Sequence, residues 1–153
     1  MNTSRVKLKS YFNQGITALF YILFPVITVS LWQKEPNNAI HYGLTCFVSF
    51  LIVSAVRHIY NAPRPWEKDP TLSPPPGKEQ KKGHSFPSRH VFSAFVITTA
   101  AFYFYPRIAM LLYLPAIALA WLRVDLGYHF KKDVIWGAIF GIGCGIIGMW
   151  LLG

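Results

Sequence analysis

Residues 10–33 read SYFNQGITALFYILFPVITVSLWQ and contain no charged side chain. A helix needs roughly 20 apolar residues to cross the hydrocarbon layer of a membrane, and this stretch is long enough to do so. Four more charge-free stretches follow it along the chain, over residues 36–56, 90–106, 108–122 and 134–153. We therefore expect an all-α membrane helical bundle of about five transmembrane helices, over residues 11–32, 38–60, 88–105, 107–123 and 132–152.

The composition agrees with a membrane protein. Hydrophobic residues make up 53% of the chain and charged residues 14%, whereas an average soluble domain has about 25% charged residues. So apolar a chain has too few polar side chains to cover a soluble domain, and it is too apolar to stay disordered. The net charge is +9, but the basic residues lack the polar scaffold of a nucleic-acid-binding domain. We expect a single membrane-embedded domain over residues 1–153, with no nucleic-acid partner.

The third and fourth charge-free stretches are short for a transmembrane helix. Arginines at their ends, at positions 89, 107 and 123, would extend them by snorkelling towards the membrane surface. Between the second and third stretches, residues 61–82 form a polar segment with six prolines, which cannot continue a helix. We expect residues 61–86 to form a surface loop.

Glycines recur at every fourth position in the last stretch, at Gly137, Gly141 and Gly145. This spacing places them on one helix face, where another backbone can approach closely. We expect this face to pack within the molecule, and a homodimer formed through it is the alternative.

If the chain crosses the membrane five times, one membrane face carries the N-terminus, the end of the second helix and the beginning of the third. The same face carries the end of the fourth helix and the beginning of the fifth. The charged residues of the opposite face are Lys34, Glu35 and Arg107. Ionisable residues at the ends of spans are costly unless they are paired or used, so their concentration on one face indicates a functional site. The polar residues that converge on that face are Arg57, Arg64, Ser88, Arg89, His90, Arg123, His129 and Asp133.

Two of these spacings have a direct structural meaning. Pro63 and Pro65 end the second helix, so Arg57 lies on its last turn and Arg64 lies just beyond it. His129 and Asp133 are four residues apart, which places them on one face of a helix that opens the fifth span. A carboxylate there would hold one imidazole nitrogen and leave the other as a stronger nucleophile.

The remaining residues indicate an anion site. Pro87 suits the first turn of a helix, so Ser88 would lie with backbone N–H groups at the positive end of the helix dipole. Several guanidinium groups beside such N–H groups can bind and neutralise a tetrahedral oxyanion. We expect the ligand to be phosphate. Because these cations already supply the charge that a metal would supply, we expect no metal ion.

Three segments carry a resemblance to a known family. The chain resembles the type 2 phosphatidic acid phosphatases, membrane lipid phosphatases of the superfamily that also contains bacterial acid phosphatases and vanadium haloperoxidases. The spacing of all three signature motifs is kept, in Arg57-His-Ile-Tyr-Asn-Ala-Pro-Arg64-Pro65, in Pro87-Ser88-Arg89-His90, and in Leu122-Arg123-Val-Asp-Leu-Gly-Tyr-His129-Phe-Lys-Lys-Asp133.

The chain departs from the family pattern at three positions. Arg57 replaces a lysine, which keeps the charge but adds a planar fork. Arg89 replaces a glycine and adds a cation, and Leu122 replaces a serine and removes a hydroxyl group. The family's membrane enzymes also have six spans as a rule, whereas we expect five here.

The resemblance implies a mechanism. His129 would attack phosphorus and form a phosphohistidine, with Asp133 orienting its ring. His90 would protonate the leaving oxygen and then activate water. No metal or other cofactor is implied. The groups that would hold the phosphoryl oxygens are Arg57, Arg64, Ser88, the backbone of Arg89, and Arg123.

The substrate class and the function each leave alternatives. A phosphate pocket at a membrane surface favours a lipid phosphate: undecaprenyl diphosphate, phosphatidylglycerophosphate, phosphatidate or a lipid A phosphate. The added Arg89 favours a diphosphate, and His84 either contacts the headgroup or makes a loop hydrogen bond. The alternatives to a phosphatase are a non-catalytic lipid-phosphate binding or transport protein, an intramembrane serine hydrolase using Ser88, His129 and Asp133, and a vanadate-dependent haloperoxidase.

We expect a multi-pass protein of a bacterial cell membrane. Lys and Arg concentrate on the face of the expected site, and the positive-inside rule places that face in the cytoplasm. Bacterial lipid phosphatases of the family that this chain resembles usually act on the outer face, so the side of the site stays open.

Overall fold

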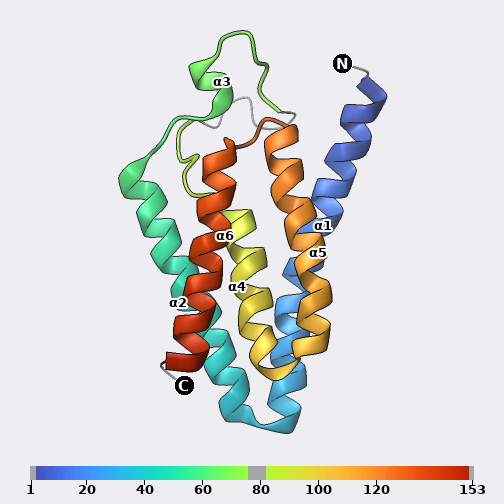
Figure 1. The fold of residues 1–153 in the computed structure, drawn as a ribbon, viewed down its shortest axis with the longest axis vertical. Coiled ribbons are helices and arrows are strands. Elements are labelled where there is room, and N and C mark those ends of the chain that lie inside the picture. The colour runs from blue at the N-terminus through green and yellow to red at the C-terminus, as the bar shows by residue number, and fades with distance from the viewer. Residues whose placement is uncertain (1–2, 76–81, 152–153) are drawn as a thin grey trace.

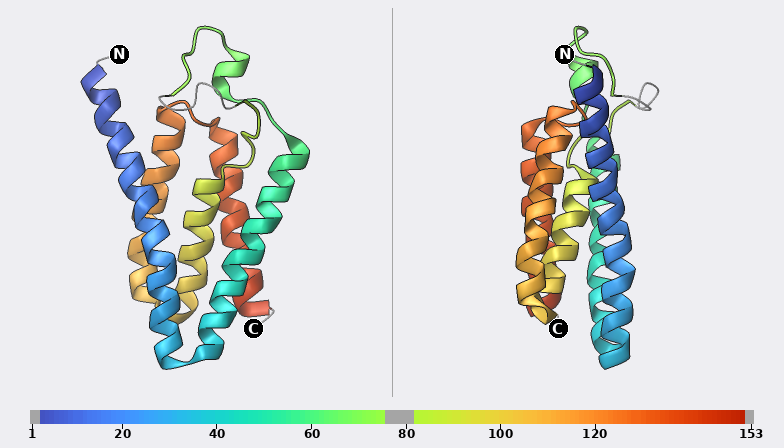
Figure 2. Two further views of the ribbon diagram at one scale, coloured as in Figure 1. Left: turned by 180° about the vertical axis from the view of Figure 1, so that it is seen from behind. Right: turned by 90° about the vertical axis from the view of Figure 1, so that its right-hand side faces the viewer.

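The described part of the chain is a bundle of five long helices whose axes are roughly aligned (Figures 1 and 2). The computed structural model describes residues 3–75 and 82–151. A four-residue helix, α3 (Pro65–Lys68), lies in the connection between α2 and α4. The expected all-α membrane bundle is confirmed. The long helices are α1 (Thr3–Lys34), α2 (Pro36–Tyr60), α4 (Arg89–Phe104), α5 (Pro106–Asp125) and α6 (Lys131–Ile146), which continues as the π-helical turn η1 (Ile147–Leu151).

Two prolines set the up-and-down order of the helices. Pro36 and Pro106 each occupy the first turn of their helix, where a missing N–H costs nothing and φ is already helical. One residue, Glu35, separates α1 from α2, and Tyr105 alone separates α4 from α5, so each pair runs antiparallel. As a result the N-terminus lies at the same end as α3 and the C-terminus at the other end (Figure 1).

An ion pair ties the beginning of α1 to this end of the bundle. Lys9 Nζ donates to Asp125 Oδ2 at 2.8 Å, where α5 ends. The same ammonium lies 5.3 Å from the centre of the Trp121 ring. Asp125, which has no role in the three motifs, therefore has a structural partner.

Helix α4 lies in the middle of the bundle and contacts all four of the other long helices. Ten of its residues are buried. Its 16 residues span about 24 Å at 1.5 Å each, which is less than the ~30 Å of hydrocarbon. The expected third span, 88–105, is thus a short internal helix, and it begins below the adjacent ends of α5 and α6 (Figure 1).

The chain that leads into α4 also differs from the expected surface loop. Gly83, Ser85 and Pro87 are buried, because the segment dips between the helices to reach the low start of α4. The expectation of a surface loop over residues 61–86 is therefore wrong for Gly83 and Ser85, and also for Arg64 and Pro65, which are buried. This return into the bundle is what carries the second motif to the site.

The glycine face of α6 packs against α4. A Cβ atom on Gly137 would lie 2.9 Å from the Ser88 carbonyl oxygen, and one on Gly141 would lie 2.7 Å from the Phe92 carbonyl oxygen. A Cβ on Gly145 would lie 2.7 Å from the Thr99 Cβ. The close approach within the molecule is as expected. The alternative of a homodimer through this face is wrong, because α4 already covers it.

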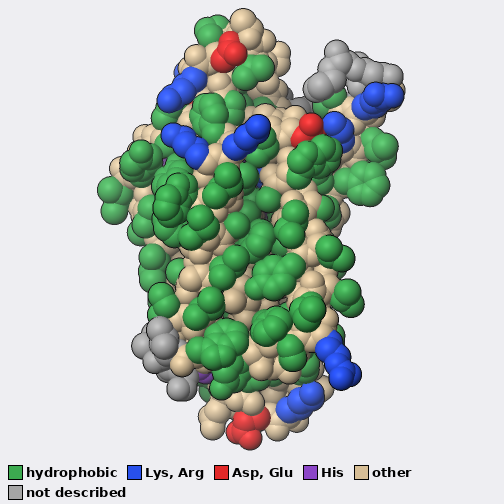
Figure 3. Space-filling model, viewed as in Figure 1, with side chains coloured by type: hydrophobic (Ala, Val, Ile, Leu, Met, Phe, Trp, Pro, Cys, Tyr) green, Lys and Arg blue, Asp and Glu red, His purple; other side chains and the backbone are tan. Residues whose placement is uncertain are grey.

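The outer surface matches a membrane environment. Apolar side chains cover the middle of the molecule, and charged side chains gather towards its two ends (Figure 3). Large side chains such as Ile22, Leu51, Leu114 and Ile135 are at least half exposed, which fits contact with lipid. Within the described residues, four helical segments are long and apolar enough to cross a membrane, namely Ser4–Lys34, Pro36–Lys68, Pro106–Asp125 and Lys131–Trp150.

The close contact between α4 and α6 can be tested by the effect of glycine substitutions on the stability of the protein. Gly141→Ala should destabilise the protein by about 1–3 kcal/mol, because the new methyl group must displace backbone and side-chain atoms of α4. Gly143 lies on the same helix, and a Cβ atom added there would have nothing within 4 Å. Gly143→Ala should therefore be neutral or stabilising by up to about 1 kcal/mol. Thermal unfolding of the detergent-solubilised variants measures both. Equal melting temperatures would contradict the close contact.

Candidate active site

The end of α2 positions Arg57. Asn61 adopts a left-handed conformation, with φ 37°, and its N–H donates to the Arg57 carbonyl oxygen at 3.0 Å, which ends the helix. Arg57 therefore lies on the last turn, as expected, and is buried. Its Nη1 atom donates to the Pro87 carbonyl oxygen at 2.6 Å and to that of Ser85 at 3.5 Å. The first motif thus holds the segment that carries the second.

Arg64 lies just beyond the helix and links two further segments. Its Nε donates to the Gly83 carbonyl oxygen at 3.0 Å, and its Nη1 donates to the Tyr128 carbonyl oxygen at 3.3 Å. Glu67 accepts hydrogen bonds from the backbone N–H groups of Arg64 and Gly83, at 3.1 and 2.7 Å. The Arg64 guanidinium is therefore fixed between the loop before α4 and the turn before α6.

His129 lies in the turn between α5 and α6, not on a helix. Gly127 has φ 73°, and the N–H groups of Tyr128 and His129 both donate to the Arg123 carbonyl oxygen. Helix α6 begins only at Lys131, so the expectation of one shared helix face for His129 and Asp133 is wrong. Their side chains still meet, with His129 Nδ1 3.7 Å from Asp133 Oδ2.

Ser85 lies between these two side chains and was missed by the sequence analysis. Its hydroxyl donates to Asp133 Oδ2 at 2.5 Å and lies 3.4 Å from His129 Nδ1. Ser85 is fully buried. The one available signal was the run Gly83-His84-Ser85-Phe86 before the second motif. The hydroxyl beside His129 is thus that of Ser85, not that of Ser88.

The surroundings of His129 favour a neutral ring. Burial lowers the pKa of His129 to about 4, and nearby guanidinium groups, with that of Arg123 foremost, act in the same direction. The interaction with the nearby Asp133 carboxylate opposes this shift of the pKa without overcoming it. Acceptor oxygens on the Nδ1 side favour the tautomer with its proton on Nδ1. The lone pair is then on Nε2.

Asp133 binds more than the histidine. Its Oδ2 accepts the N–H of Phe130 at 3.1 Å, and its carbonyl oxygen accepts the N–H of Ser88 at 2.9 Å. The Ser88 N–H is therefore used within the protein. Pro87 precedes the helix, and Ser88 is the N-cap residue of α4, one position later than expected. Among the described residues, the buried Ser88 Oγ has no hydrogen-bond partner.

The last turn of α5 carries Arg123. Its guanidinium carbon lies 4.8 Å from the centre of the Tyr128 ring. The side chain is buried, and its Nε atom has no hydrogen-bond partner in the part of the chain that the structure describes.

Arg89 and His90 open α4. Arg89 is exposed, and its guanidinium carbon lies 5.8 Å from the centre of the Phe50 ring. His90, one residue further on, is partly buried. His84 has φ 52°, its Nδ1 lies 3.0 Å from the Arg57 carbonyl oxygen, and its ring stacks on His58 at 5.7 Å. His84 thus makes the loop hydrogen bond while facing a cavity.

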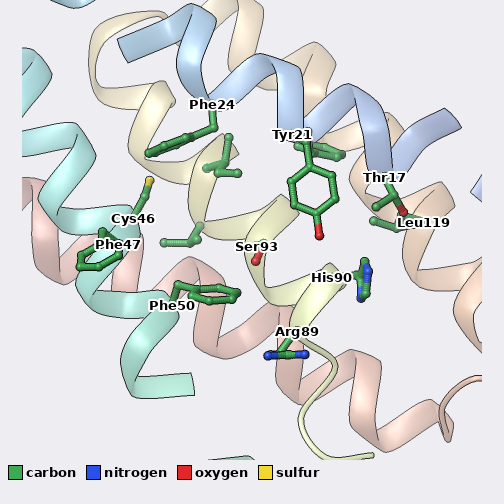
Figure 4. A pocket seen from close by; sticks show the side chains of 13 residues that line it. Thr17, Tyr21, Phe24, Cys46, Phe47, Phe50, Arg89, His90, Ser93 and Leu119 are labelled. Carbon is green, nitrogen blue, oxygen red and sulfur yellow. The ribbon is translucent and has the colours of Figure 1, made fainter. Parts of the chain in front are cut away.

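Two cavities meet at the start of α4. We call the first the polar cavity, of about 420 Å³, which is lined by Ser54, Arg57, His58, Arg64, Lys82, Gly83, His84 and Arg89. We call the second the apolar cavity, of about 270 Å³, which lies among α1, α2, α4 and α5. Figure 4 shows Arg89 and His90 at one end of the apolar cavity and Phe24 with Cys46 at the other.

The four arginines of the motifs, Arg57, Arg64, Arg89 and Arg123, form what we call the arginine cluster. Among the described residues, the only ion pairs are Lys9 with Asp125 and His129 with Asp133. No described carboxylate therefore forms an ion pair with any arginine of the cluster. Since a buried cation without a partner is costly, the arrangement is prepared for an anion that the protein does not supply. The guanidinium fork suits phosphate oxygens.

Comparison with solved structures shows the same fold in two bacterial proteins. The Aquifex aeolicus LpxE structure superposes with a TM-score of 0.72 and 28% sequence identity, over 92% of this chain and 84% of that one. The transmembrane PAP2-type phosphatidylglycerolphosphate phosphatase of Bacillus subtilis superposes with a TM-score of 0.76 and 18% identity, over 97% of this chain and 76% of that one. No curated protein sequence matches the chain.

The family assignment rests on more than the shape of the bundle. The family model of the PAP2 superfamily matches residues 38–153, which is most of the chain and includes all three motifs. The fold, the motif residues around His129 and the family match agree, so this multi-pass membrane protein belongs to the PAP2 superfamily and is a phosphatase-family enzyme.

Proposed function

We propose that the protein removes a phosphate group from a membrane lipid through a phosphohistidine intermediate on His129. The observation that carries this proposal is a buried histidine on which the charges of Arg57, Arg64 and Arg123 act. These arginines form no ion pair with a carboxylate among the described residues. Such a site has the charge that a phosphoryl group requires and the nucleophile that attacks it.

The cleaved phosphoryl group would be held mainly by buried cations. Arg57 and Arg64 are fixed by backbone carbonyl groups, so little order is lost when they bind an anion. Arg123 Nε and Ser88 Oγ, which have no hydrogen-bond partner among the described residues, would donate to the phosphoryl oxygens. Charge spreads over these oxygens in the transition state, which preorganised donors stabilise.

The chemistry divides into two displacements. The His129 Nε2 lone pair forms a bond to phosphorus while the bond from phosphorus to the leaving oxygen breaks, and His90 donates a proton to that oxygen. His90 then takes a proton from water, the water oxygen attacks phosphorus, and the N–P bond breaks to release inorganic phosphate. Asp133 and Ser85 hold the Nδ1 proton throughout and stabilise the charge on the ring.

A lipid substrate is supported by the apolar cavity. It opens beside His90 and is lined by aromatic and aliphatic side chains, including Phe20, Phe24, Phe47, Phe50 and Leu119. Since His90 protonates the leaving oxygen, the rest of the leaving group would extend into this cavity. A water-soluble phosphate ester would leave it unused. The candidate substrates are an isoprenoid diphosphate, phosphatidylglycerophosphate, phosphatidate and a lipid A phosphate.

Replacing His129 tests the nucleophile. His129→Ala should lower phosphate release at least about 1,000-fold, because the covalent step is lost and the binding groups remain. The assay measures inorganic phosphate from a panel of these lipids with purified protein in detergent, with and without EDTA. Lys132→Ala, on the exposed surface of α6, is the control for purification and folding.

Two outcomes of that assay would contradict the proposal. Substantial release by His129→Ala would exclude His129 as the nucleophile. Release from none of the lipids by the wild-type protein would favour a non-catalytic lipid-phosphate binding protein.

Ser85 makes a second prediction about the same site. Ser85→Ala should lower kcat about 10–100-fold, because Asp133 and His129 would lose a contact that positions them and a displacement of about 1 Å can cost about 100-fold in rate. Because Ser85 acts through Asp133, the double variant Ser85→Ala/Asp133→Asn should be less than about 3-fold slower than Asp133→Asn alone. Steady-state kinetics of the four proteins in this cycle give the comparison. Fully multiplicative losses would show that the two residues act independently.

A further inference from the structure

Arg89 occupies a position that cleavage of a single phosphate group does not explain. It is the one described residue that lines both the polar cavity and the apolar cavity. It is also the residue that stands where the resembling family has glycine. Its guanidinium lies over Phe50 of α2, with no carboxylate partner among the described residues. A cation is thus held at the junction between a charged cavity and an apolar one.

The direction of the proposed reaction indicates which part of the substrate would lie beside Arg89, where the two cavities meet. In the proposed reaction His129, on which the charges of Arg57, Arg64 and Arg123 act, attacks phosphorus, and His90 protonates the leaving oxygen. His90 lines only the apolar cavity of the two, and Arg89 lies beside it at the same end (Figure 4). A group attached to the leaving oxygen therefore passes Arg89 before the lipid tail enters the apolar cavity.

We infer that Arg89 recognises a second phosphate group on the leaving side of the substrate, so that the preferred substrate is a lipid diphosphate. This inference rests on the proposed function and specifies its substrate class. Arg57, Arg64 and Arg123 serve the phosphate that is cleaved, and Arg89 serves the one that remains on the lipid. A guanidinium fork can bind two oxygens of that group at once.

The size and charge of the polar cavity agree with two phosphate groups. The polar cavity has about 420 Å³, which is space for several water-sized groups. Its lining contains Lys82 and the stacked pair His58 and His84 besides the arginines, and its described residues include no acidic one. A diphosphate carries more negative charge than a monoester, and this lining can balance it.

Arg89 also has a chemical part in diphosphate cleavage. When His129 Nε2 bonds to the terminal phosphorus, the bond to the bridging oxygen breaks and its electron pair stays on that oxygen. The oxygen then belongs to a lipid monophosphate, which accepts the proton of His90. Arg89 beside this group stabilises the charge that develops on it. Water then displaces His129 and releases inorganic phosphate, so the overall products are lipid monophosphate and phosphate.

The test compares two substrates that share one lipid chain, farnesyl diphosphate and farnesyl monophosphate, in the same detergent micelles. The ratio of their kcat/KM values should favour the diphosphate in the wild-type protein and fall about 10-fold or more in Arg89→Gln. The ratio for Arg89→Lys, which keeps the charge without the planar guanidinium group, should lie between the wild-type ratio and the Arg89→Gln ratio. Arg107→Gln is the matched control, because Arg107 is an exposed arginine at the first turn of α5, at the other end of the bundle, and its ratio should equal that of the wild type.

A second pair of substrates separates two sources of the second phosphate. Phosphatidylglycerophosphate carries it as a phosphodiester beyond a glycerol unit, and phosphatidate lacks it. If the preferred substrate is a lipid diphosphate, Arg89→Gln should lower the ratio of kcat/KM for farnesyl diphosphate to that for farnesyl monophosphate (the farnesyl ratio). It should change the corresponding ratio for phosphatidylglycerophosphate and phosphatidate (the phospholipid ratio) less. A larger change in the phospholipid ratio would overturn the assignment of a diphosphate. An unchanged farnesyl ratio in Arg89→Gln would overturn the role of Arg89 itself.

A binding measurement separates this inference from the proposed phosphatase activity. The non-cleavable methylene diphosphonate analogue of farnesyl diphosphate should bind at least about 10-fold more tightly to the wild type than to Arg89→Gln, with farnesyl phosphonate as the reference. Such binding by a protein that releases no phosphate would contradict the phosphatase proposal and still support Arg89 recognition. Equal binding by wild type and Arg89→Gln would overturn the inference even in an active enzyme.

Discussion

The buried carboxylate and backbone of Asp133 join three segments of the site, namely the loop before α4, the start of α4 and the turn before α6. Asp133 holds Ser85 from the loop before α4, Phe130 from its own helix N-terminus, and Ser88 at the start of α4. It also lies against the His129 ring. These contacts need α4 and α6 at backbone distance, which the glycine face of α6 provides. Asp133 Oδ2 accepts two hydrogen bonds, which offset part of the cost of burying the carboxylate and hold the loop and the start of α6 where the chemistry requires them. Among the described residues, Oδ1 has no hydrogen-bond partner.

The contacts of Asp133 also determine where the charges of the site lie. A short α4 begins inside the bundle, so Arg57 and Arg64 near its start are withdrawn from water and donate to backbone carbonyl groups. The protein supplies them with no carboxylate among its described residues. The same depth places the start of α4 beside an apolar cavity. A charged group and a hydrocarbon chain can therefore be bound next to one another, which is the chemical description of a lipid phosphate.

Part of this site was predictable from local rules. Prolines end helices, so Arg57 and Arg64 could be placed at and beyond the end of α2, and charge-free stretches located the long helices. Other features depend on tertiary packing. Gly127 turns the chain so that His129 precedes α6, and a four-residue spacing alone cannot distinguish this turn from a helix. Ser85 looked like a loop residue, because nothing local indicates that its segment returns into the bundle. The segment of α4 was predicted to be a transmembrane helix, because an apolar sequence of this length is equally typical of a short helix buried inside a bundle.

The central claim is that His129 carries the phosphoryl group between substrate and water. Rapid mixing of the wild-type protein with a lipid labelled with ³²P at its terminal phosphate, followed by quenching in alkali, tests it most directly. We predict a transient phosphoprotein that is stable in alkali and labile in acid, with its label on the peptide that contains His129 and none in His129→Ala. Rapid turnover with no labelled protein, or a label that persists in His129→Ala, would contradict it.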